Sequence, residues 1–339
     1  MMETREITKS SNVRIFGISR PFGLWLQGGV LFGACLQSPM AHALTLKEVQ
    51  TSQSNFGSWV AAESPRAVDP QKSGIPSAVF RAGAMEEEAE LPHLRLTDTE
   101  RNDSLAVNLP ASFDWRNVNG QSFVPPVPAQ GECGACVSFA ASGTLEMQLG
   151  IACNLPQRPF AMSKQYLHSC GGASCRGGWM ISKAVDFLVE SGTPDEACLP
   201  YLAQDGVCSQ ACSDVDKRTV RLFSYEQPTT GFIDVNKIKS ALLKGPLLSS
   251  MILYEDLEFY KSGVYRYATG NKLGSHAVVI VGWSDSDRAW IVRNSWGSKW
   301  GEGGFFKAAW DDTNVLVGRY TWLFDVSNAV REGVCRLPR

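Results

Sequence analysis

The spacing of apolar residues after Pro110 changes from a helical period to a strand period along the chain. Residues 136–151 show the period of a helix, with small and apolar side chains near one face. Ser163 can cap a short second helix, and residues 179–190 continue a helical period until Gly192. We therefore predict that the first part of this region is mainly helical.

The second part of the region has the pattern of a sheet. Asp234 can cap a short helix that ends at Gly245. Runs typical of strands then dominate, at residues 247–253, 276–283, 289–294 and 305–310. We predict an α+β architecture, in which a cleft between the two parts is the natural place for a functional site. The mainly helical part covers residues 109–215, the mainly β part 216–325, and a C-terminal extension 326–339.

The amino terminus has the pattern of an export signal. Basic residues precede a moderately apolar run at 22–36, and the run is followed by Ala41-His42-Ala43, an A-x-A cleavage pattern. We interpret residues 1–43 as a signal peptide. A membrane anchor is the alternative, but the run contains glutamines and glycines and is short for a spanning helix. Lipidation of Cys35 is a second alternative, because residues 31–35 loosely resemble a bacterial lipoprotein signal.

Residues 44–108 differ in composition from the region after Leu109. They contain no cysteine, and they carry 6 Lys or Arg against 10 Asp or Glu, including Glu86, Glu87 and Glu88. We interpret this stretch as a propeptide, and a solvated linker is the alternative.

Composition and charge limit which cellular compartment and which binding partners we expect. The chain has 339 residues, of which 44% are hydrophobic and 19% charged, as in ordinary globular proteins. A net charge of −2 without a basic field disfavours nucleic acid and, apart from export, a membrane. Nine of the ten cysteines lie from Cys133 onward, which indicates an oxidising, secreted or periplasmic location.

Three separate stretches of the sequence contain candidate catalytic residues. The stretch from Gln130 to Cys136 (Gln-Gly-Glu-Cys-Gly-Ala-Cys) precedes the first predicted helix. His276 lies 140 residues after Cys136, and Asn294 begins an Asn-Ser-Trp-Gly stretch. A thiol needs ionisation to act as a nucleophile, and both a helix N-terminus and an imidazolium partner lower its pKa. We therefore expect a depressed pKa for Cys136.

These motifs resemble the papain and cathepsin family of cysteine peptidases, and the resemblance runs from Leu109 to about Tyr320. It implies the papain-like two-domain fold, with a helical domain and an antiparallel β-barrel-like domain on either side of the active site. It also implies a secreted endopeptidase that is made as a zymogen, acts on protein or peptide substrates and is inhibited by its own propeptide. No cofactor and no metal are implied.

By the resemblance, Cys136 forms an acyl-enzyme and His276 acts as general base and acid. Asn294 orients the imidazole ring, and Trp296 shields that hydrogen bond from water. The side-chain amide of Gln130 and the backbone N–H of Cys136 stabilise the oxyanion.

The resemblance also suggests residues that bind the substrate, and counting from Tyr320 places Trp322 at the base of a pocket. A tryptophan there predicts a preference for small or medium apolar side chains over Phe and Arg. No occluding loop with paired histidines is visible, which favours endopeptidase action. The expected substrate-binding residues are Gly178, Trp179, Met180, Ala277, Trp296 and Trp322.

Two disulfides are expected from the family pattern, Cys133 with Cys175 and Cys170 with Cys208. Elimination then leaves the pairs Cys198–Cys212 and Cys153–Cys335, with the connectivity of these four cysteines open. Two alternatives are a four-thiolate zinc site of Cys133, Cys136, Cys170 and Cys175 and a redox dithiol of Cys133 and Cys136. Both leave Gln130, His276 and Asn294 unexplained. His168 lies in a helical stretch, and we expect a structural role for it.

The chain departs from the family pattern at Val137, where the family usually has Trp, and it lacks the cysteines of a third bridge. Residues 44–108 show no clear match to the long helical propeptide of related enzymes. Two other functions remain open. One is an acyl transferase on the same fold, and the other is a binding or adhesion protein without turnover.

Overall fold

The computed structural model describes residues 44–53, 58–63, 83–85, 109–157 and 160–336. The predicted signal peptide at 1–43, with Cys35, and most of the predicted propeptide lie outside the described residues. No helix within the described ranges has the length and apolar character needed to cross a membrane.

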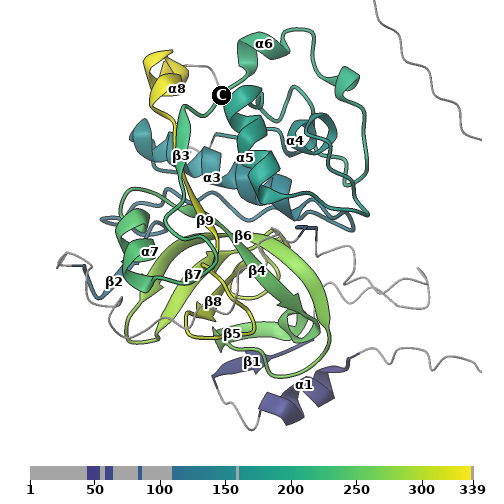
Figure 1. Ribbon diagram of the computed structural model, residues 1–339, viewed down its shortest axis with the longest axis vertical. Helices are drawn as coiled ribbons and strands as arrows, with labels where there is room; N and C mark the ends of the chain where they lie inside the picture. Colours follow the sequence, from purple (N-terminus) through teal and green to yellow (C-terminus); the bar gives the residue numbers. More distant parts are fainter. Residues whose placement is uncertain (1–43, 54–57, 64–82, 86–108, 158–159, 337–339) are drawn as a thin grey trace, which may run out of the picture. The chain divides into compact units, whose positions relative to one another are not determined.

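Helices form the upper part of the molecule in Figure 1. The longest, α3 (Cys136–Ala152), contacts α4 (Lys164–Cys170) and α5 (Ile181–Glu190), and on another side it contacts the sheet. Nearly every residue of α3 is therefore buried, whereas the sequence period predicts one buried face. A helix enclosed by a sheet and other helices is apolar all round, which weakens any one-sided pattern. The short helices are η2 (Cys208–Gln210) and α6 (Val215–Arg218).

A nine-stranded sheet fills the lower part of the molecule, in the order β1-β5-β8-β7-β6-β4-β9-β3, with β2 on β6. Its pairs are antiparallel, as the fold prediction expects, except for β5 with β8, which are parallel. The strands are β1 (Trp59–Ala61), β2 (Ser112–Asp114), β3 (Ser224–Glu226), β4 (Leu247–Tyr254), β5 (Tyr260–Tyr265), β6 (Lys272–Ser284), β7 (Ala289–Arg293), β8 (Phe305–Ala309) and β9 (Thr321–Asp325).

The predicted helix caps are confirmed. The Ser163 hydroxyl accepts a hydrogen bond from the Tyr166 N–H at the start of α4, and Asp234 accepts one from Lys237 at the start of α7 (Val235–Leu242). Such caps satisfy N–H groups that have no partner within the helix. The pattern predicted the four strands β4, β6, β7 and β8, but it missed β5 and β9, which do not show a plain alternation of buried and exposed positions.

Four disulfides brace the helical part, and they are the four pairs named from the sequence. Cys133–Cys175 and Cys170–Cys208 lie near the start of α3 and the end of α4, and Cys198–Cys212 closes a short loop. Cys153–Cys335 ties the end of α3 to the C-terminal segment, which forms α8 (Ser327–Arg331) and η4 (Val334–Arg336). Residues 326–336 thus return to the helical part.

The described part of residues 44–63 packs on the sheet, which a solvated linker would not do. Helix α1 (Leu46–Gln53) buries Val49 beside η3 (Glu255–Phe259), and β1 pairs antiparallel with β5 (Figure 1). Trp59 in β1 is 6% exposed, it lies edge-on to Tyr265, and its indole N–H donates to the Arg266 carbonyl. Trp59 is therefore an anchor of this segment.

Trp59→Ala should release β1 from the sheet, because loss of a buried tryptophan costs about 3 to 5 kcal/mol. Hydrogen exchange read by mass spectrometry should show faster exchange of residues 58–63, with little change in β6 and β7. Val60→Ala is the matched control, because Val60 lies in the same strand and is 56% exposed. Equal exchange rates in the two variants would contradict the anchoring role.

Candidate active site

Cys136 is the first residue of α3, and it is the only free cysteine among the described residues. The N-cap residue, Ala135, accepts no hydrogen bond with its side chain from the first N–H groups of α3. These N–H groups lie at the end of the helix that carries the Cys136 sulfur. The positive end of the helix dipole favours a thiolate there. The disulfide between Cys133 and Cys175 holds the loop that leads into this helix.

The sheet brings His276 to the same place. His276 lies in β6, and the backbone N–H of the next residue, Ala277, donates to Cys136 Sγ over 3.4 Å. His276 Nε2 lies 2.9 Å from Asn294 Oδ1, just after the end of β7. Both side chains are buried, at 0% and 2% exposure. The structure thus unites three residues that stand far apart in the sequence.

The indole of Trp296 covers the histidine. Its ring centroid lies 5.3 Å from that of His276, with an interplanar angle of 38°. Trp296 is 3% exposed and packs edge-on against Trp300. The indole therefore excludes water from the pair of His276 and Asn294, which strengthens the hydrogen bond between them.

Gln130 is held near the start of α3 by a network that the sequence pattern does not reveal. Its Nε2 donates to the Cys133 carbonyl over 2.9 Å, and its Oε1 accepts from the Ser295 hydroxyl over 2.5 Å. Its backbone carbonyl accepts from the Tyr201 hydroxyl over 2.7 Å. An amide nitrogen carries two hydrogens, so one remains for a further acceptor. Ser295 and Tyr201 are thus positioning residues, and their signal in the sequence is weak because hydroxyl residues are common.

Residues 83–85 run across the site from the predicted propeptide. Trp179 N–H donates to the Gly83 carbonyl over 2.7 Å, and Met85 N–H donates to the Trp179 carbonyl over 2.8 Å. On the other side, Ala84 N–H donates to the Ser275 carbonyl over 3.2 Å. The segment therefore bridges the helical part and the sheet directly beside His276.

Gly83 and Gly178 allow this close approach. A Cβ on Gly83 would lie 2.0 Å from the Gly134 carbonyl oxygen, and a Cβ on Gly178 would lie 2.0 Å from the Gly83 carbonyl oxygen. Gly178 also has a positive φ of +69°, which residues with side chains rarely adopt. The obstacles are backbone atoms, so a side chain at any of these positions would force the segment away. Gly83 has no recognisable signal in the sequence.

Burial raises the pKa of the Cys136 thiol to about 11. Backbone hydrogen bonds from Ala277 and Gly83 act in the opposite direction, but burial is the larger effect. The expectation of a depressed pKa is therefore wrong for this form of the chain. The reason is desolvation: the sulfur is 0% exposed beneath the crossing segment, and a low-dielectric surrounding disfavours the thiolate.

His168 lies next to the disulfide between Cys133 and Cys175. Its Nε2 is 3.6 Å from Cys133 Sγ and 3.1 Å from Asp205 Oδ1, and burial lowers the pKa of its imidazole. Cys133, His168 and Cys175 lie close enough to suggest a metal site, but the two sulfurs form a disulfide and offer no thiolate. Packing against the disulfide accords with a structural role.

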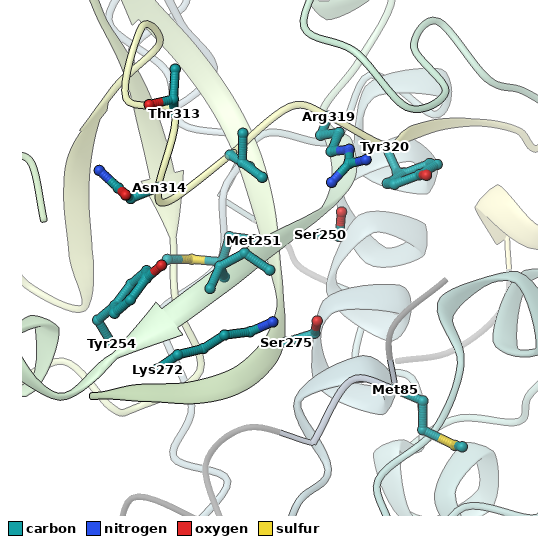
Figure 2. A pocket seen from close by; sticks show the side chains of 12 residues that line it. Met85, Ser250, Met251, Tyr254, Lys272, Ser275, Thr313, Asn314, Arg319 and Tyr320 are labelled. Carbon is teal, nitrogen blue, oxygen red and sulfur yellow. The ribbon is translucent and has the colours of Figure 1, made fainter. Parts of the chain in front are cut away.

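The remaining sequence-predicted residues fall into two places. Gly178, Trp179 and Ala277 adjoin the crossing segment and the sulfur, and half-buried Met180 precedes α5. Trp322 is 1% exposed and belongs to the same apolar core as Trp179 and Ala277. A pocket beside Met85 is lined by other residues, which the sequence pattern did not single out (Figure 2).

The buried thiol predicts a pH profile. Alkylation of Cys136 by iodoacetamide in the full-length chain should rise about tenfold per pH unit up to about pH 11, because only the thiolate reacts and its fraction grows until the pKa is reached. Gly83→Ala should raise the rate at neutral pH and lower the apparent pKa. Met85→Ala is the control, because Met85 is 51% exposed. Identical profiles for Gly83→Ala and the unchanged chain would refute the role of the crossing segment.

Several known proteins are similar to this chain in sequence. A family model described as papain family cysteine protease matches residues 109–319. Cathepsin B-like CP2 of Giardia intestinalis is 31% identical over 297 residues, which are 84% of this chain and 96% of that protein. Procathepsin L of Mus musculus is 34% identical over 230 residues, which are 62% of this chain and 64% of that protein.

Solved structures of precursors are also similar. ProCathepsin B S9 from Trypanosoma congolense superposes with a TM-score of 0.65 at 25% identity, over 84% of this chain and 99% of that one. Digestive procathepsin L2 from the Tenebrio molitor larval midgut superposes with a TM-score of 0.64 at 26% identity, over 83% and 88%. The family model spans more than half of the residues, and the fold and the sequence agree. The chain belongs to the papain family of cysteine proteases.

Proposed function

We propose that this cysteine protease is an exported endopeptidase, made as a zymogen, in which Cys136 attacks the peptide carbonyl. The observation that carries the proposal is the hydrogen bond from Ala277 N–H to Cys136 Sγ together with the contact of His276 with Asn294. These contacts put a free thiol beside a histidine whose far nitrogen is occupied by an amide. A nucleophile next to an oriented base is the arrangement that acyl transfer requires.

In the proposed reaction, the Cys136 sulfur forms a bond to the carbonyl carbon of the substrate. The carbon–nitrogen bond then breaks, and the imidazolium of His276 gives its proton to the leaving amine. His276 next takes a proton from water, whose oxygen attacks the thioester and releases the acid and the free thiol. Asn294 keeps the imidazole ring in one orientation through both steps.

The oxyanion of each tetrahedral intermediate needs donors that are already in place. Gln130 is suited to this task because Ser295 and Tyr201 fix it from two sides, which leaves little to reorganise during the reaction. The backbone N–H of Cys136, at the start of α3, is the proposed second donor. Trp296 keeps water away from the base, as a low-dielectric site requires.

The proposed organisation is a signal peptide at 1–43, a propeptide at 44–108 and the peptidase from 109 onward. Residues 44–63 dock on the sheet, and residues 83–85 occupy the space over the nucleophile, which supports inhibition by the propeptide. Four disulfides support export to an oxidising compartment.

The crossing segment also bears on specificity. Ala84 is 7% exposed and lies in the apolar core that contains Trp179 and Trp322. A small apolar residue thus fills this position in the precursor. It supports the proposed preference for small or medium apolar side chains.

Variants test the assigned roles. Cys136→Ala and His276→Ala should lower kcat/KM by roughly 10⁴-fold or more, because the nucleophile and its base act as one unit. Gln130→Ala should lower kcat by about 10²-fold to 10³-fold, and Asn294→Ala should weaken turnover. Gln210→Ala, at an exposed glutamine, is the matched control for Gln130. Normal turnover by Cys136→Ala on a peptide substrate would sink the mechanism.

One mass spectrometry experiment measures both the removal of the proposed propeptide and the reactivity of Cys136. The exported protein, after acid treatment, is incubated with an irreversible epoxide inhibitor of papain-like enzymes. We expect one label, on Cys136, in a chain that begins near Leu109. A label absent from every cysteine, on a correctly folded and processed chain, would favour a binding protein without turnover. Addition of an amine during peptide cleavage separates hydrolysis from acyl transfer by the product formed.

A further inference from the structure

A pocket of about 340 Å³ opens on the sheet beside the crossing segment. It lies between β4, the start of β6 and the loop that leads into β9, as Figure 2 shows. None of the sequence-predicted catalytic residues lines it. Its walls are formed by Met85, Ser250, Met251, Ile252, Tyr254, Lys272, Ser275, Thr313, Asn314, Leu316, Arg319 and Tyr320.

The charge of this pocket is one-sided. Two of its lining residues, Lys272 and Arg319, are cationic, and none of the twelve is acidic. Figure 2 shows the Lys272 ammonium directed toward Ser275, with Ser250 and the Arg319 guanidinium on the other side of the pocket. The pocket therefore combines two cations with the hydroxyl groups of Ser250 and Ser275. This combination of donors suits a carboxylate.

Arg319 is held in place by its surroundings. Its Nε donates to the Gly231 carbonyl over 3.0 Å, and its guanidinium lies 5.5 Å from the ring centroid of Tyr320. Within the described ranges, the two terminal nitrogens of Arg319 make no other hydrogen bond or ion pair. A guanidinium that is fixed at Nε presents its terminal N–H groups in one direction, which lowers the entropy lost when it binds an anion.

The pocket is within reach of a bound peptide. Gly83 lies over Cys136, Ala84 pairs with Ser275, and Met85 lines the pocket. An extended chain rises about 3.3 Å per residue, so the pocket begins roughly 7 Å from the nucleophile along such a chain. A substrate that takes this path would bring to the pocket a side chain two or three residues from the scissile bond.

We propose that this pocket receives an acidic side chain of the substrate, and that Lys272 and Arg319 determine this specificity. The inference rests on the proposed function, since it names a substrate class for the same site. The preferred substrate carries Asp or Glu two or three residues from the scissile bond, next to a small or medium apolar residue. The chain's own sequence has matching charges, because Glu86, Glu87 and Glu88 come directly after Met85.

The test uses the activated enzyme and internally quenched peptides that differ only by Glu or Gln at each position near the scissile bond. We expect kcat/KM to be about 10-fold to 100-fold higher for Glu at one position two or three residues away, the range of a charge-assisted hydrogen bond. Added salt should reduce this ratio, because part of the pocket faces solvent.

Lys272→Gln and Arg319→Gln should each lower the ratio, and the double variant should bring it near one. The kcat/KM for the Gln peptide should fall less than that for the Glu peptide, because a neutral amide makes weaker hydrogen bonds with the two cations than a carboxylate does. Lys261→Gln is the matched control, since Lys261 is exposed on β5 and lines no part of the pocket. Lys272→Gln leaves the hydrogen bond between Arg319 and Gly231 intact, so it keeps the test valid if Arg319→Gln folds poorly.

The outcomes separate the two proposals. Equal cleavage of Glu and Gln peptides at every position, by an enzyme that still labels at Cys136 and turns over, overturns the acidic specificity alone. A Glu preference that survives in the double variant also overturns it. Failure of both labelling and turnover on all peptides overturns the proposed function instead.

Discussion

The contact between the first turn of α3 and strand β6 is the constraint on which the site depends. Cys136 belongs to the helical part and His276 to the sheet, so neither can act unless the two parts are packed together. The hydrogen bond from Ala277 to Cys136 Sγ joins them at the reacting atom. Behind it, Val137 and Ala140 of α3 share one apolar core with Val279 of β6. The packing of this core holds the Cys136 sulfur and the imidazole ring of His276 in one arrangement.

The same closeness explains why the chain is expected to be latent. The backbone of Gly83 comes close to Gly178 and Gly134, where an added Cβ would lie 2.0 Å from the Gly83 carbonyl oxygen and 3.3 Å from the Gly83 Cα, respectively. Burial of the thiol raises its pKa to about 11, and the backbone hydrogen bond from Gly83 only partly offsets this effect. Removal of the segment would restore solvent and leave the helix N-terminus and the histidine to favour the thiolate. In the proposed zymogen, residues 83–85 would therefore oppose the activity by covering the thiol.

Specificity, in this view, comes from two neighbouring surfaces of different chemistry. The proposed apolar position is marked by Ala84, which shares one apolar core with Trp179 and Trp322. Lys272 and Arg319 make the adjoining pocket cationic. Apolar selection by one extra methylene is weak, whereas a site built for a charged group discriminates more strongly against its neutral analogue. The cationic pocket would therefore carry the larger share of the discrimination.

The order of elements and the identity of the reactive groups were accessible from the sequence, because they depend on local signals. The period of residues 136–151, the caps at Ser163 and Asp234, and the family motifs around Cys136 and Asn294 are each contained in a short stretch. Strands β5 and β9 were missed because their pairing partners, rather than their own pattern, make them strands.

Only the tertiary structure decides the properties that depend on contacts between segments far apart in the sequence. The sequence determined which thiol, imidazole and amide the chain possesses, and that α3 would begin at the thiol. It did not determine the pKa of Cys136, because the burial that raises this pKa depends on which distant segments pack around the thiol. Nor did it reveal the pocket of Lys272 and Arg319, whose charges add only because β6 and the loop before β9 face the same space. Burial and charge act through space, and the fold alone decides which residues share that space.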